Sequence, residues 1–225
     1  MSKVAILVDG GFYRKRARHL FGETDGAAAA DQMYDYVRRH LKHGDELYRI
    51  FYYDCPPIEK QVYHPLLKRA INFQRTPQYT WMTAFLERVC RKRKLALRMG
   101  QLSDTQTYNL KPKAVKDLCS GKITLDDLTE ADFILDAKQK GVDMMIGVDI
   151  ASMAFKRQVD RIVLIAGDSD FVPAAKLARR EGIDFVLDPL WATITPSLNE
   201  HIDGIYTWCA NPISKKENTP TEQVD

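Results

Sequence analysis

Four aspartates in this chain stand where side chains could bind a divalent cation. Asp9 ends the first predicted strand, Asp168 and Asp170 follow a later buried strand, and Asp143 begins a predicted helix. Because parallel strands present their carboxyl ends at one edge of a sheet, these side chains are expected to converge there. Converging carboxylates repel one another unless a cation lies between them. Mg²⁺ or Mn²⁺, which prefer oxygen ligands, are the expected cofactors.

A site of this kind could hydrolyse phosphoesters, because a bound cation activates water and stabilises in-line displacement at phosphorus. Each aspartate also has a structural alternative, since a lone Asp after a strand often caps the next helix. Asp170 could cap the helix that begins at Phe171, and Asp143 could cap its own helix. The coincidence of Asp9 with Gly-Asp-Ser-Asp favours the metal site. Asp149 lies about 120° around the helix from Asp143, so it is predicted outside the cluster.

The elements that must position these residues alternate along the chain. Strands are predicted at 3–9, 47–53, 95–99, 161–166, 183–187 and 205–208, and helices at 12–20, 31–43, 79–94, 114–119, 129–139, 142–157, 171–181 and 192–203. This alternation predicts an α/β fold with a mostly parallel sheet flanked by helices on both faces. We expect one domain over 1–210 with an insertion around 55–125, partly helical over 58–78, and a disordered polar tail at 211–225.

Composition narrows the class of protein. No apolar run approaches the length that spans a membrane, and the run at 4–8 is too short for a signal-peptide core. The four cysteines form no C-x-x-C pair and have no zinc-binding spacing, which favours reduced thiols in a cytoplasmic protein. The first strand lacks the G-x-G-x-x-G of a dinucleotide-binding domain, and no Walker motif is present.

Basic residues concentrate in the first part of the chain. Residues 1–100 carry 19 Lys+Arg and 10 Asp+Glu, a net +9, whereas residues 101–225 carry 14 and 20, a net −6. This asymmetry suits a protein that grips a polyanion with one part and a cation with the other. The predicted nucleic-acid-binding residues are Arg14, Lys15, Arg16, Arg38, Arg91 and Arg93, of which Arg14 and Arg16 directly follow the Asp9 turn. Their alternative is a set of solvated helix faces.

Several aromatic side chains could stack unpaired bases. They are Tyr52, Tyr53, Tyr63, Phe73, Tyr79, Trp81 and Tyr108. The alternative for each is packing in the core, because most lie in strand-like or amphipathic settings.

Three segments resemble the NYN domain family, a branch of the PIN-like nuclease superfamily, and within it the LabA-like proteins. They are VAILVDGGF at 4–12, KQKGVD at 138–143 with the helix that follows, and VLIAGDSDFVP at 163–173. The resemblance implies a PIN-like three-layer α/β sandwich and a Mg²⁺- or Mn²⁺-dependent ribonuclease. It assigns Asp9, Asp143, Asp168 and Asp170 to the metal site, and Ser169 to positioning water or phosphate. Phe12 departs from the family pattern, which often has Asn there.

The leading hypothesis is a metal-dependent ribonuclease that acts on RNA, including single-stranded RNA. The alternatives are a non-catalytic RNA-binding or regulatory module of the same fold, supported by Phe12, and a metal-dependent phosphatase that acts on small phosphoesters. The aromatic insertion at 55–125 is expected to supply substrate contacts or the interface of a homo-oligomer.

Overall fold

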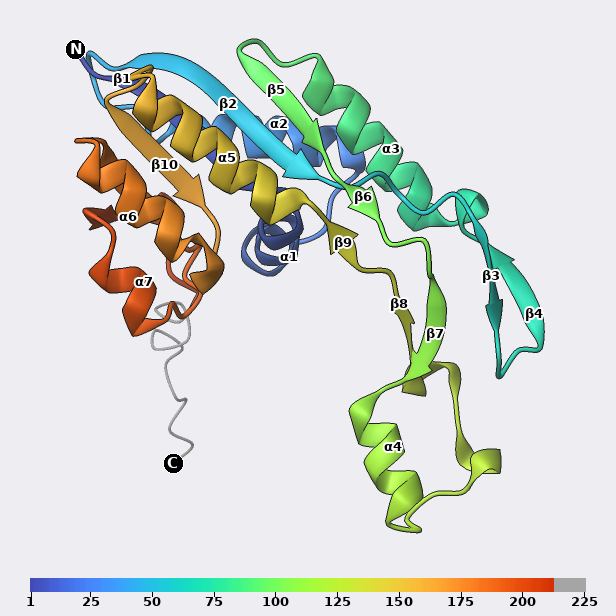
Figure 1. The fold of residues 1–225 in the computed structure, drawn as a ribbon. Coiled ribbons are helices and arrows are strands. Elements are labelled where there is room, and N and C mark those ends of the chain that lie inside the picture. The colour runs from blue at the N-terminus through green and yellow to red at the C-terminus, as the bar shows by residue number, and fades with distance from the viewer. Residues whose placement is uncertain (213–225) are drawn as a thin grey trace, which may run out of the picture.

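A six-stranded parallel sheet forms the centre of the computed structural model, which describes residues 1–212 (Figure 1). Its strand order is β12–β11–β10–β1–β2–β5, with bounds β1 (Lys3–Asp9), β2 (Glu46–Asp54), β5 (Leu95–Met99), β10 (Arg161–Ile165), β11 (Asp184–Asp188) and β12 (Gly204–Ile205). After β5 the chain returns to place β10 on the other side of β1. The strand order therefore reverses between β1 and β10, the place where doubly wound sheets bind ligands.

Helices cover both faces of the sheet, so the predicted three-layer sandwich is confirmed. One face packs against α1 (Gly10–Phe21), α2 (Gly26–Arg38) and α3 (Pro77–Cys90), and the other against α5 (Val142–Phe155), α6 (Val172–Arg180) and α7 (Pro196–Glu200). The alternation of side chains along β1 accounts for this, because Val4, Ile6 and Val8 face α1–α3 whereas Ala5 and Leu7 face α5. None of the helices in the described part is long and apolar enough to cross a membrane.

A two-stranded ribbon leaves the sheet between β5 and α5 and projects away from it (Figure 1). It consists of the antiparallel pairs β6 (Gln101–Leu102) with β9 (Gln139–Lys140) and β7 (Thr107–Leu110) with β8 (Phe133–Asp136), and it carries α4 (Pro112–Cys119), η2 (Leu125–Asp127) and η3 (Glu130–Asp132). A hairpin of β3 (Gln61–His64) and β4 (Arg69–Asn72), followed by η1 (Phe73–Arg75), lies beside it. His64 and Tyr108 join the two, with ring centroids 4.3 Å apart.

The helix predicted at 129–139 is wrong. Thr129 and Asp132 form a capping box that closes only the short turn η3, and the next residues pair as β8 with β7. The apolar run Phe133–Leu135 suits a strand as well as a helix, and a cross-strand partner decided between them. The segment 58–78, expected to be partly helical, forms a hairpin, one 3-10 helix and the first residues of α3.

Other helices differ from prediction at their ends. Asp25 caps α2 by accepting a hydrogen bond from the Ala28 N–H at 2.9 Å, so this helix begins earlier than residue 31. The helix predicted at 192–203 is limited to α7, which starts at Pro196. Arg179 of α6 fixes the segment after it, because its Nε donates to Asp203 Oδ1 at 2.8 Å. Most of the polar tail predicted at 211–225 lies outside the described residues.

Candidate active site

Asp9 lies at the carboxyl end of β1 and caps α1. Its Oδ1 accepts a hydrogen bond from the Phe12 N–H at 3.1 Å. Burial raises the pKa of the Asp9 carboxyl; the Phe12 N–H opposes this rise, and the negative charge of Asp143 adds to it. The net direction is upward, so the protein alone disfavours the carboxylate form. A cation beside Asp9 would reverse that preference.

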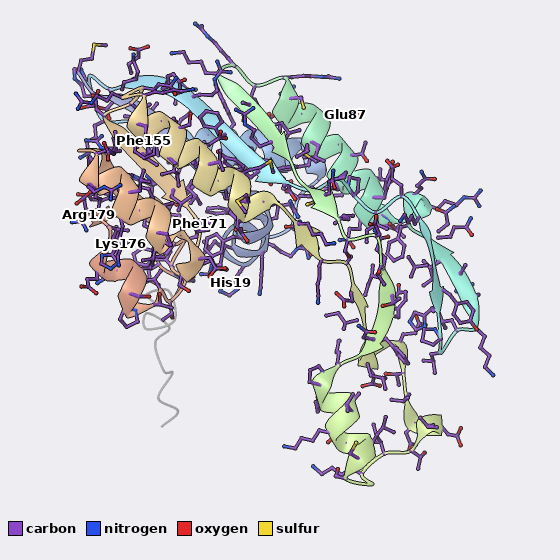
Figure 2. The ribbon with its side chains drawn as sticks, viewed as in Figure 1. His19, Glu87, Phe155, Phe171, Lys176 and Arg179 are labelled. Carbon is purple, nitrogen blue, oxygen red and sulfur yellow. The ribbon has the colours of Figure 1, made fainter. Side chains whose placement is uncertain are left out.

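The segment after β10 brings Asp168 and Asp170 to the same edge. Asp168 Oδ1 accepts a hydrogen bond from the Asp170 N–H at 3.1 Å, which shapes the short helix η4 (Ser169–Phe171). Phe171 is buried and anchors this turn to the core under α5 and α6 (Figure 2). Asp168 and Asp170 themselves are exposed, so their charges face solvent at the edge of the sheet.

Phe12 packs the two turns together. A Cβ atom placed on Gly167 would lie 2.5 Å from Phe12 Cε2, so a larger residue at this position would require the Phe12 ring to shift. The aromatic ring therefore fills the space between the Asp9 turn and the Gly167-Asp168 turn. The family that the sequence resembles often has Asn at position 12. In this chain, Phe12 provides a packing contact there in place of a polar side chain.

Asp143 stands in the first turn of α5 and completes the group. Burial raises the pKa of its carboxyl, and the charges of Asp168 and Asp170 raise it further. The structure thus places Asp143 close enough to interact electrostatically with Asp9 on one side and with the η4 aspartates on the other. Four carboxylates are gathered where the strand order reverses.

The spacing of these carboxylates is open. Among residues 1–212, no three His, Cys, Asp or Glu side chains lie close enough together to hold an ion unaided. The aspartates therefore interact electrostatically but are too far apart to enclose an ion by themselves. This arrangement does not agree with a closed structural metal site, in which protein side chains surround the ion. Mg²⁺ takes one or two carboxylates and completes its shell with water and substrate phosphate, and an all-oxygen donor set of this openness fits that mode.

Replacing Asp9 by Asn should stabilise the metal-free protein. The raised pKa of Asp9 means that the folded state binds more protons than the unfolded state between the ordinary value of 3.8 and the raised value. Stability is therefore lost as the pH rises through this interval, and the loss persists near neutral pH. Asn keeps the helix cap but carries no charge. In EDTA near neutral pH, we expect the melting temperature of Asp9→Asn to rise by roughly 2–4 °C.

Added Mn²⁺ should reverse the order of stability, because it stabilises a protein that binds it and affects the variant less. Melting curves with EDTA and with Mn²⁺ check both statements. A variant less stable than the parent in EDTA would show that the Asp9 charge is already compensated within the protein.

Asp54 is a site residue that the sequence analysis missed. It ends β2, next to Asp9 on β1, and its carboxylate is fully buried. Its Oδ2 forms an ion pair with Arg14 and accepts a hydrogen bond from the Tyr52 hydroxyl at 3.1 Å, while its Oδ1 accepts one from Gln139 Nε2 at 3.3 Å. The signal was available, since Asp54 directly follows a predicted strand. The rule that found Asp9 applies equally to it.

The structure places the predicted basic residues in different surroundings. Arg14 is paired with Asp54, and Arg16 donates from both Nε and Nη2 to the Leu190 carbonyl, at 3.0 and 2.6 Å. Lys15 is exposed on α1 and forms no ion pair within residues 1–212. Arg14 and Arg16 thus hold the local structure, whereas Lys15, which lies between them in the sequence, faces solvent.

Arg38, Arg91 and Arg93 lie elsewhere. Arg91 and Arg93 follow α3 and precede β5, so they stand at the amino edge of the sheet, opposite the aspartates. Tyr34 connects them with Arg38: its hydroxyl donates to the Arg93 carbonyl at 3.0 Å, and its ring lies 5.4 Å from the Arg38 guanidinium carbon. These three arginines do not adjoin the carboxylate cluster.

Asp149 lies outside the cluster, as its position on α5 predicted. Its Oδ2 accepts hydrogen bonds from the Tyr53 hydroxyl at 2.8 Å and from Arg98 Nε at 3.1 Å. Tyr52 and Tyr53 are fully buried, so core packing, not base stacking, is correct for them. Ser169 adjoins Asp168 and Asp170 in η4.

Comparison with known proteins identifies one family. Residues 82–198, more than half of the chain, match the NYN domain, and this stretch contains Asp143, Asp168, Ser169 and Asp170 but begins after Asp9. No curated protein matches. A crystal structure of a protein of unknown function from Vibrio parahaemolyticus is 16% identical over 91% of each chain with a TM-score of 0.45, a likeness too low to carry an argument. The chain belongs to the NYN domain family, which places it in the PIN-like nuclease superfamily.

Proposed function

We propose that this protein is a metal-dependent ribonuclease whose metal site is formed by Asp9, Asp143, Asp168 and Asp170. The observation that supports it most is the gathering of these carboxylates where the strand order reverses, where burial raises the pKa of Asp9 and Asp143 and the neighbouring negative charges add to the rise. The order of the three resembling segments further supports a place in the LabA-like branch. Membership of the NYN family supports nuclease chemistry.

Bound Mg²⁺ or Mn²⁺ would supply Lewis-acid stabilisation of charge at phosphorus and a lowered pKa for water. The chain's own contribution is preorganisation. Backbone N–H groups fix Oδ1 of Asp9 and of Asp168, so each carboxylate is held in a defined orientation. Ser169 stands between two of the aspartates, where its hydroxyl could orient water or a phosphate oxygen.

Cleavage of labelled single-stranded RNA tests the proposal. We expect strand cleavage with Mn²⁺ or Mg²⁺ and none above background with EDTA, because the crowded carboxylates need a cation to act together. Restoring Mn²⁺ after EDTA should restore cleavage. Cleavage that persists in EDTA would contradict the proposal, as would complete inactivity in both metals by a protein shown to be folded.

The two rival functions give different results in the same assay. The contact of Phe12 with Gly167, in place of a polar side chain near the aspartates, favours the non-catalytic RNA-binding module as the second candidate. That module would bind RNA in EDTA and cleave none in any metal. Hydrolysis of a small aryl phosphoester without cleavage of RNA would instead identify a phosphatase.

A further inference from the structure

A large cleft opens beside the carboxylate cluster. Its volume is about 930 Å³, near the upper end of the usual range for ligand pockets. It lies between α1, the start of α3 and the projecting ribbon, and Gly11 and Gln139 line its end nearest Asp9. Gln139 also donates to Asp54 and lies against Gly11, so this end of the cleft is continuous with the Asp9 turn.

One wall of the cleft is cationic. Lys15 and Arg18 of α1 line it, both exposed, and Arg14 lines it too but is paired with Asp54. Lys15 has no ion-pair partner within residues 1–212. The Arg18 guanidinium pairs with Glu23 at 3.2 Å, and both side chains are about three-quarters exposed, so this pair is weak and can exchange for another anion. The wall therefore offers positive charge to a ligand's phosphates.

The opposite wall is aromatic. Phe73, Tyr79, Trp81 and Tyr108 line it, and each is half-buried, so each ring is anchored on one side and open to the cleft. Trp81 is held by a hydrogen bond from Nε1 to the Thr24 carbonyl at 2.7 Å and by stacking on Phe85. Tyr108 is held against His64. Fixed aromatic faces opposite mobile cations are the arrangement that binds unpaired bases and their backbone.

We propose that this cleft holds an unpaired stretch of RNA, with phosphates along Lys15 and Arg18 and bases on the aromatic wall, and delivers it to the aspartates. The inference rests on the proposed function only in that the bound strand is then cleaved at the aspartates. A duplex is disfavoured, because its bases are already stacked on one another and cannot present their faces to the tyrosines. Lys15, Arg18, Phe73, Tyr79 and Trp81 all precede residue 82, so they lie outside the stretch that matches the family.

Binding by the Asp168→Asn protein in EDTA tests the cleft without cleavage. The probes are a fluorescent single-stranded RNA of about ten nucleotides, the same sequence as DNA, and the RNA duplex, followed by anisotropy. We expect the single strand to bind at least about 10-fold more tightly than the duplex. Equal or tighter binding of the duplex would overturn the inference, and the DNA arm shows whether the sugar matters.

Substitutions in the two walls should act differently. Tyr79→Leu should weaken binding about 5- to 100-fold with an unchanged salt dependence, whereas Tyr79→Phe, which keeps the ring, should bind like the parent. Lys15→Gln should lower the slope of log K against log salt by about 0.7, the value for one phosphate contact on a single strand. Melting temperatures confirm that each variant is folded.

The matched control is the Lys156→Gln, Arg157→Gln protein, which loses two exposed charges at the end of α5 away from Asp143 and should retain its affinity and most of its salt slope. Unchanged affinity in both Tyr79→Leu and Lys15→Gln would overturn the inference and leave the cleft to another class of ligand, such as a peptide. Intact binding without cleavage in metal by the parent would defeat the proposed function and leave the cleft standing. Metal-dependent cleavage by the parent, with unchanged RNA affinity in both Tyr79→Leu and Lys15→Gln, would support the proposed function and overturn the proposed role of the cleft.

Discussion

Asp168→Asn should reduce RNA cleavage by at least about 100-fold while leaving the fold unchanged. The expected size follows from the several kcal/mol that metal ions contribute to such reactions, since each 1.36 kcal/mol is a factor of ten in rate. The fold should persist because Asn can still accept the hydrogen bond that Asp168 Oδ1 takes from the Asp170 N–H. Single-turnover cleavage in saturating Mn²⁺, with a melting curve of each protein, measures both effects.

Asp25→Asn is the matched control, because Asp25 caps α2 as Asp168 caps η4 and its substitution removes the same charge. Its cleavage rate should equal that of the parent. Equal loss in Asp25→Asn and Asp168→Asn would point to a general effect of charge, and full activity in Asp168→Asn would remove Asp168 from the site. Partial rescue of Asp168→Asn at higher Mn²⁺ would assign the loss to weakened metal binding.

The core of this fold was readable in the sequence because its strands are buried on both faces. The runs at Val4–Val8 and Ile162–Ile165 are continuously apolar, as expected for parallel strands covered by helices. Their order along the chain then implied one shared edge for Asp9 and Asp168. The pattern of apolar residues could not predict contacts between the ends of neighbouring strands, such as the packing of Phe12 on Gly167. These contacts depend on which strands become neighbours in the sheet.

The projecting ribbon could not be predicted in the same way. Its strands are short and half-exposed, and β8 pairs with β7 across more than twenty intervening residues. Local periodicity around Phe133 carries no information about such a partner, so a helix was the natural but incorrect interpretation. The same gap hid the cleft, because its lining combines α1 and the start of α3 with residues of the ribbon and of the segment after the β3–β4 hairpin, which local periodicity could not place together.

Arg14→Met should cost about 3 kcal/mol of unfolding free energy, although its place beside the Asp9 turn suggested phosphate binding. The change leaves the Asp54 carboxylate, which is fully buried, without its cation. Loss of one partner of a buried pair typically costs about 3–5 kcal/mol, and Arg14, still 24% exposed, belongs at the lower end. Urea unfolding should show the loss, with a fall in melting temperature of roughly 6–12 °C.

The double variant Arg14→Met, Asp54→Asn separates a structural role from a role in binding. Asn removes the unpaired charge and can keep the contacts with the Tyr52 hydroxyl and the Cys55 N–H, so most of the lost stability should return. Arg88→Met, which breaks the exposed pair with Asp31, should lower the melting temperature far less. If Arg14 only holds Asp54 in place beneath Gly10 and the Asp9 turn, the double variant also recovers RNA affinity. If Arg14 contacts phosphate, stability returns but affinity does not, and the cationic wall of the cleft then extends to Arg14.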